Sequence, residues 1–76
     1  MKCFLQVGGA GLDEAVLYSS ISNAVFAYGR IARDLARFGQ KVEATVHIAE
    51  TRKEIQGYPD FVLKLGPHGG ILKERA

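Results

Sequence analysis

The chain holds one thiol and two imidazoles, the side chains that most often act as nucleophiles, proton-transfer groups or metal ligands: Cys3, His47 and His68. A structural zinc site needs about four such ligands, usually in close-spaced pairs, and the sequence has no such pair. A cysteine–histidine nucleophile would need Cys3 and His47 to meet, but strand alternation predicts that they point to opposite faces of a sheet. We therefore predict no catalytic residue, no metal site and no enzyme activity, with His68 in a turn.

A glycine-rich segment at residues 8–11 is similar to a fragment of a phosphate-binding loop. A dinucleotide fingerprint needs a third glycine, and that position holds Glu14, whose carboxylate would repel phosphate. Asp13 and Glu14 also form a pair of neighbouring carboxylates, but the surrounding residues predict a flexible loop and no pocket. We expect a hairpin loop here, and no cofactor.

A long amphipathic helix is the clearest predicted element and covers about residues 20–38. The serines at its start can cap its first turn, and Gly39 suits the left-handed position after its last turn. Gly29, in mid-helix, indicates close packing of the helix on a sheet. Apolar residues recur at helical spacing and form one stripe: Ile21, Ala24, Val25, Tyr28, Ile31, Ala32, Leu35 and Phe38.

The polar side of this helix carries a phenylalanine among three arginines: Phe26, Arg30, Arg33 and Arg37. At about 100° per residue, each arginine falls within about 40° of Phe26 on a helical wheel. Arginines and aromatic residues contribute much of the binding energy at protein interfaces, so we predict a partner-binding surface here. The alternative is a solvated basic face in which Asp34 pairs with Arg30 or Arg37.

Strands are predicted where apolar and polar residues alternate, at residues 2–7, 41–49, 61–65 and 71–74. Residues 14–18 fit a further short strand or the beginning of a helix, residues 51–54 fit one helical turn, and residues 66–70 fit a hairpin turn. The prediction is one α+β domain over residues 1–76. It has an antiparallel sheet of four to five strands with the helix packed on one face, in the order ββαβββ or βαβββ.

The sheet face away from the helix is expected to be bare, because a single helix covers only the other face. Alternation places mixed polar and apolar side chains on this face: Phe4, Gln6, Glu43, Thr45, His47, Val62 and Lys64. Such a face suits a homodimer packed sheet on sheet, or another protein partner. The alternative is simple exposure to water.

Composition narrows the possible classes of protein. The 76 residues allow one domain, and the 47% hydrophobic content excludes a disordered chain. The single cysteine excludes an internal disulfide, no run approaches the ~20 apolar residues of a membrane span, and no signal peptide is expected. These features favour a cytoplasmic protein that does not enter a membrane. The net charge of +2 is too small to indicate a nucleic-acid partner by itself.

Three segments resemble small proteins of bacteria and their phages: Ser20-Ile-Ser-Asn-Ala-Val25, Glu43-Ala-Thr-Val-His-Ile-Ala49 and Gly66-Pro-His-Gly-Gly-Ile71. In size and in its one-helix sheet the chain is also similar to the anti-CRISPR proteins, small phage products that bind and block host defence complexes. The resemblance implies a phage-borne inhibitor acting in the host cell cytoplasm. Anti-CRISPR proteins share no motif, so the resemblance assigns no residue.

We therefore expect a small non-enzymatic protein that binds another protein, such as a bacterial CRISPR–Cas complex. The alternative is a nucleic-acid-binding accessory factor that holds phosphates with the same arginines. An RNA-recognition sheet is not favoured, because Glu43, Thr45 and His47 replace the aromatic and basic residues that its central strands need.

Overall fold

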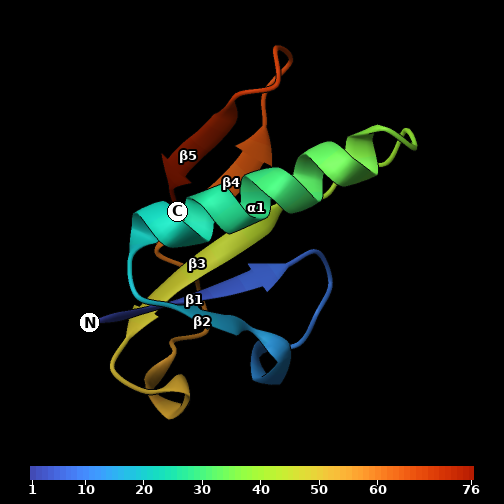
Figure 1. Cartoon of the computed structure of the whole chain (residues 1–76). Coiled ribbons are helices and arrows are strands. Elements are labelled where there is room, and N and C mark those ends of the chain that lie inside the picture. Colours follow the sequence, from blue (N-terminus) through green and yellow to red (C-terminus); the bar gives the residue numbers. More distant parts are fainter.

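Five strands, one α-helix and two short 3₁₀ turns follow one another in the computed structural model, which describes residues 1–76 (Figure 1). The strands are β1 (Lys2–Val7), β2 (Val16–Tyr18), β3 (Ala44–Ala49), β4 (Phe61–Leu65) and β5 (Ile71–Arg75). The helix is α1 (Ile21–Ala36), and the 3₁₀ turns are η1 (Leu12–Glu14) and η2 (Arg52–Glu54). The order of strands and helix is ββαβββ, the fuller of the two predicted orders.

The strands form one antiparallel sheet in the order β2-β1-β3-β4-β5. The central pair is β1 with β3, in which Phe4 lies opposite His47 and Leu5 opposite Val46. Because successive side chains alternate between faces, Leu5 and Val46 point toward α1 while Phe4 and His47 point away from it. The predicted α+β class is confirmed. The two edges of the sheet are β2 and β5.

The helix begins and ends where its capping residues predict. The Ser20 hydroxyl accepts a hydrogen bond from the Asn23 N–H at 3.1 Å. At the other end Gly39 has a φ of 74°, and the Gln40 N–H donates to the Leu35 carbonyl at 3.1 Å. This pattern is a Schellman cap, which needs a left-handed residue that glycine adopts without strain. The regular helix is slightly shorter than the predicted 20–38 because Arg37 and Phe38 belong to the capping turns.

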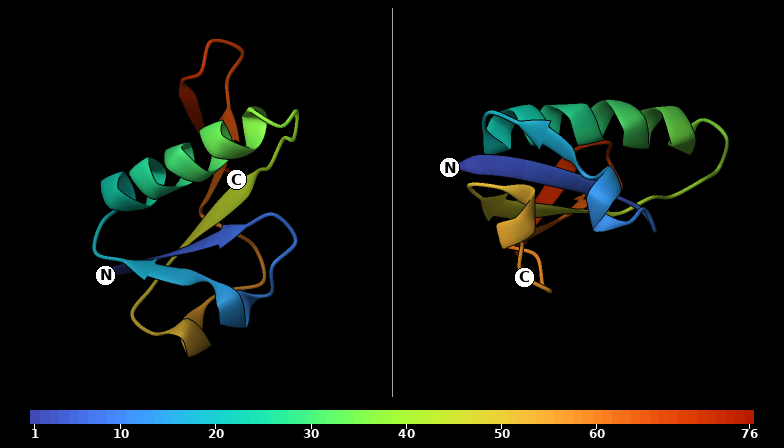
Figure 2. Two further views of the ribbon diagram at one scale, coloured as in Figure 1. Left: turned by 45° about the vertical axis from the view of Figure 1, so that its right-hand side comes forward. Right: turned by 90° about the horizontal axis from the view of Figure 1, so that it is seen from below.

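The main core lies between α1 and the sheet (Figure 2). Tyr28 is fully buried at its centre and packs among small residues such as Ala24 and Ala32 of the helix and Ala44 of β3. Its hydroxyl donates to the Val42 carbonyl at 2.6 Å. This hydrogen bond ties the connection before β3 to the helix, and β3 begins at Ala44 rather than at the predicted residue 41.

A second, smaller core covers part of the opposite face, which we had predicted to be bare. Phe4, Ala15 and Ala49 are buried there, with Ile55 packed against them. The Arg52 guanidinium lies 5.1 Å from the centre of the Phe4 ring and donates to the Leu12 and Ala15 carbonyls at 2.9 and 2.7 Å. The prediction of an open face is therefore wrong at this end of the sheet, because η1 and η2 fold beneath it.

Two predicted elements are shorter than their patterns suggested. Residues 14–18 divide into the end of η1, the buried Ala15 and the three-residue strand β2. Residues 51–54 form a 3₁₀ turn in which the Thr51 hydroxyl contacts the Glu54 carboxylate at 3.2 Å, without the backbone bonds of a capping box. The 16-residue α1 is the longest helix, and no helix here is long and apolar enough to cross a membrane.

Candidate functional site

The outer side of α1 presents the four residues singled out from the sequence, which we call the α1 ridge: Phe26, Arg30, Arg33 and Arg37. All four are exposed, and the Phe26 side chain has 69% of its surface open to solvent. Their common side follows from helical geometry, since residues four apart lie one above the other. The four side chains are therefore open to solvent, and their role in binding a partner stays a prediction.

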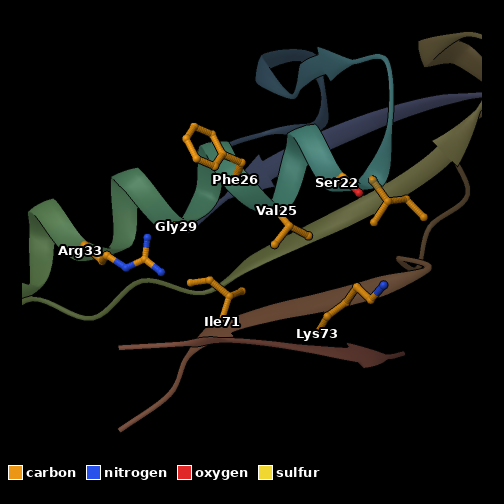
Figure 3. A pocket seen from close by; sticks show the side chains of 8 residues that line it. Ser22, Val25, Phe26, Gly29, Arg33, Ile71 and Lys73 are labelled. Atoms are coloured by element: carbon orange, nitrogen blue, oxygen red, sulfur yellow. The ribbon is translucent and has the colours of Figure 1, made fainter. Parts of the chain in front are cut away.

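Phe26 stands between two surface grooves. The first, the α1–β5 groove, has a volume of about 510 Å³ and is bordered by Ile21, Ser22, Val25, Phe26, Gly29, Arg33, Ile71 and Lys73 (Figure 3). The second, the α1–β2 groove, has a volume of about 570 Å³ and is bordered by Tyr18, Asn23, Phe26, Ala27, Arg30, Ile31 and Asp34. The aromatic ring therefore lies between two shallow, open grooves, where a partner could contact it.

Arg30 and Arg33 of the ridge point to different sides of the helix. Arg30 borders the α1–β2 groove, whereas Arg33 reaches toward β5 and donates through Nε and Nη2 to the Gly69 carbonyl, at 3.2 and 3.1 Å. Gly29 permits this path, because a β-carbon there would lie 3.2 Å from Nη1 of Arg33 and 3.5 Å from Ile71. Arg33 thus joins the helix to the turn between β4 and β5 and closes one end of the α1–β5 groove.

The charges around the ridge are mostly unneutralised. Asp34 lies 3.7 Å from Arg37, one of the two pairings that the sequence allowed. Lys73 and Arg75 of β5 lie over the Phe61 ring, at 5.3 and 5.9 Å from its centre. No carboxylate lies within 4 Å of either of these cations, or of Arg30 and Arg33. The helix side of the molecule therefore presents positive charge beside an exposed aromatic ring.

The other predicted surface, on the face away from α1, is only partly available. Phe4 and His47 do lie on that face, but they are 3% and 4% exposed, so they cannot contact a partner without local opening. Gln6 and Thr45 lie next to His47 and are half-buried.

The remaining residues of that predicted surface lie elsewhere. Glu43 precedes β3 and is exposed, while Lys64 in β4 is half-buried. Both border a separate hollow near the end of α1 rather than the cluster around His47. Val62, opposite Thr45, is also half-buried. The structure therefore does not bring the predicted sheet-face residues together into one exposed surface.

A small polar cluster forms around the buried histidine. The Gln6 amide nitrogen donates to the Ala10 carbonyl, which leaves Gln6 Oε1 to accept from Thr45 Oγ1 at 3.2 Å and from His47 Nε2 at 3.1 Å. We assign the His47 proton to Nε2 on this basis. His47 Nδ1 is buried and has no hydrogen-bond partner. Burial lowers the pKa of His47, and the more weakly acting charge of Asp60 opposes this shift.

The thiol and imidazoles lie apart, as strand alternation predicts. Cys3 is buried in the core beneath α1, where burial raises the pKa of its thiol. His47 lies on the opposite face, and His68 is exposed in the turn between β4 and β5. No three histidine, cysteine, aspartate or glutamate side chains come close enough together to hold a metal ion.

Four residues that shape these surfaces were not singled out from the sequence. Alternation along residues 71–75 places Ile71, Lys73 and Arg75 on one face, and the strand order brings that face beside α1. Arg52 was missed because its partners lie about forty residues away along the chain. The sequence does contain one indication that this segment packs against the sheet: Ile55 is an isolated apolar residue in a polar segment.

Comparison with known proteins gives no family and no relative: no family model, no curated protein and no solved structure matches this chain. Its function must therefore be inferred from the surfaces described above.

Proposed function

We propose that this protein acts without catalysis, by binding another protein through the α1 ridge. The observation that carries the proposal is Phe26, a large apolar side chain that is 69% exposed between two grooves and flanked by Arg30 and Arg33, neither of which has an anionic partner. Phenylalanine and arginine are enriched at the centres of protein interfaces. Fully burying a phenylalanine side chain contributes about 1.5–3 kcal/mol, which is enough to anchor an interface.

The resemblance to anti-CRISPR proteins in size and organisation supports a particular setting for this binding. We propose a phage-borne protein that acts in the cytoplasm of the host cell and inhibits a CRISPR–Cas complex. In this setting, adding the protein to a reconstituted CRISPR–Cas complex should abolish cleavage of the target by that complex. Full cleavage by every such complex tested, with the protein in excess, would remove this setting and leave the binding proposal in place.

The binding proposal is tested with a matched pair of substitutions. Phe26→Ala removes the ridge aromatic, whereas Phe38→Ala removes a phenylalanine that is 80% exposed but lies off the ridge. We expect capture of the partner from a host lysate to be lost with Phe26→Ala and with Arg30, Arg33 and Arg37 changed together to glutamate. Capture should be kept with Phe38→Ala, and circular dichroism should confirm that all variants fold. Equal capture by wild type and all variants would contradict the proposal.

The second candidate is a nucleic-acid-binding accessory factor. It is favoured by the positive charges of the α1 ridge and of β5: Arg30, Arg33, Arg37, Lys73 and Arg75. Binding dominated by phosphates weakens steeply with added salt. Tight, salt-sensitive binding of DNA or RNA would support this candidate, and no binding at low salt would remove it.

A further inference from the structure

The edge strand β5 has a free set of backbone hydrogen-bonding groups. The Gly66 N–H donates to the Gly70 carbonyl at 2.6 Å and the Ala76 N–H donates to the Asp60 carbonyl at 3.2 Å. In an antiparallel ladder, alternate residues bond to the same neighbour, so Leu72 and Glu74 are the residues that face β4. The backbone groups of Ile71, Lys73 and Arg75 therefore point outward, where no strand lies.

Helix α1 runs alongside this edge in the opposite direction. Arg33 contacts Gly69, and Gly29 lies over Ile71. Four helical residues advance about 6 Å and two strand residues about 6.6 Å. The helix and the first half of the strand therefore stay in step, and the α1–β5 groove is bordered by Ile71 and Lys73 of β5 (Figure 3).

The groove has an apolar floor and a cationic rim. Val25 and Ile71 line its floor, and the missing side chain of Gly29 leaves space above Ile71. Arg33 and Lys73 are the only charged residues that border it. Arg75 continues the positive charge along β5, while Glu74 alternates onto the opposite face.

We propose that an extended, acidic segment of the partner protein pairs with the edge of β5 as a sixth strand, with the side chains of one of its faces directed toward the α1–β5 groove. This inference rests on the proposed function and names the chemistry of the partner. Backbone pairing with an exposed edge supplies affinity that does not depend on sequence, and alternate side chains supply specificity. The segment's apolar side chains lie over Ile71 and beside Phe26, and its carboxylates approach Lys73 and Arg33.

The same features disfavour two other occupants. Antiparallel pairing of β5 with β5 of a second copy would bring the Lys73 and Arg75 side chains of the two copies close together, and lysine on an edge strand is a known barrier to such pairing. A nucleic acid offers no alternating N–H and C=O groups to pair with the edge.

A library of short random peptides displayed on phage provides the probe, selected against the folded wild-type protein. We expect the recovered peptides to be rich in aspartate and glutamate alternating with apolar residues. A synthetic peptide of the consensus sequence should bind Lys73→Glu at least about tenfold more weakly, because a like charge replaces an attractive one. Its affinity for Lys53→Glu, the same charge change in the exposed η2 turn, should stay within about twofold of wild type.

Amide hydrogen exchange of the complex locates the peptide. The Ile71, Lys73 and Arg75 amides should exchange at least about tenfold more slowly when the peptide is bound, because they then donate to it. The Leu72 and Glu74 amides, which already face β4, should change little.

Four results would overturn the inference: peptides without acidic bias, equal affinity for Lys73→Glu and wild type, no protection of the three outward amides, or tighter binding of an oligonucleotide in the same groove. If the acidic peptides fail but partner capture still requires Phe26, the groove inference is wrong and the proposed function stands. If the Phe26→Ala variant also captures the partner as well as wild type does, the proposed function is wrong too.

Discussion

The buried His47 makes the stability of the fold depend on pH. Its neutral ring fits a cluster in which Gln6 Oε1 accepts from Nε2, and a proton on Nδ1 would place an unpaired charge in the interior. Burial lowers the pKa of this imidazole in the folded protein relative to the unfolded chain. The unfolded chain therefore binds more protons below about pH 6.5, and the free energy of unfolding falls as the pH drops through that range.

We predict that replacing His47 by glutamine removes this dependence. Urea unfolding of the wild type should shift to lower midpoints between about pH 7 and about pH 5, while the midpoint of His47→Gln should change less over the same range. Carboxylates titrate in both proteins, so the difference between the two profiles is the relevant quantity. Parallel profiles would show that His47 is as accessible to protons in the folded protein as in the unfolded chain.

Gly29 lies at the contact between α1 and β5. Replacing it therefore tests both the helix propensity of α1 and how closely α1 packs on β5. A β-carbon would meet Ile71 at an ordinary 3.5 Å but would press on Nη1 of Arg33 at 3.2 Å. We predict that Gly29→Ala raises the free energy of unfolding by about 0.5–1 kcal/mol through helix propensity, while Nη1 of Arg33 moves aside by a few tenths of an ångström and the bonds to the Gly69 carbonyl are kept. Urea unfolding and the exchange rate of the Arg33 Nε proton measure the two effects. A clear loss of stability would show that the contact cannot admit a methyl group.

At the scale of elements, Arg52 holds the two 3₁₀ turns beneath the sheet. It belongs to η2, donates to carbonyls at both ends of η1, and covers the Phe4 ring. We predict that Arg52→Ala lowers the free energy of unfolding by about 1–3 kcal/mol, because two charge-assisted hydrogen bonds and a cation–π contact are lost together. Lys53→Ala, at the neighbouring exposed position, is the control and should change stability by less than about 0.5 kcal/mol. Equal effects of Arg52→Ala and Lys53→Ala would mean that Arg52 does not hold η1 and η2 beneath the sheet.

Local patterns predicted most of the elements, and long-range contacts explain what they missed. Alternation assigned Cys3 and His47 to opposite faces, and helical spacing placed Phe26 with its arginines, because both depend only on near neighbours in the chain. The path of η2 under Phe4 depends on Arg52 reaching η1, which no local pattern encodes. For the same reason the sequence predicted the ridge but not the contribution of Lys73, which follows from β5 lying beside α1.

At the scale of the whole molecule, the helix side carries an excess of positive charge. Helix α1 and β5 carry four cations without a carboxylate partner: Arg30, Arg33, Lys73 and Arg75. Four carboxylates lie around η1, η2 and the end of β3, together with the cations Arg52 and Lys53: Asp13, Glu14, Glu50 and Glu54. A partner with an acidic surface is therefore attracted to the side that presents Phe26. This asymmetry orients the encounter even though the net charge is only +2.

The central claim is that a partner protein contacts the α1 ridge, and site-specific photo-crosslinking tests it most directly. A benzophenone amino acid is placed at Phe26 in one variant and at Phe38 in a second, two exposed positions of which the second lies beyond the end of the helix. The account predicts one crosslinked protein from position 26 after irradiation in host lysate, and none of that protein from position 38. Crosslinking of the same protein from position 38 but not from position 26 would contradict it.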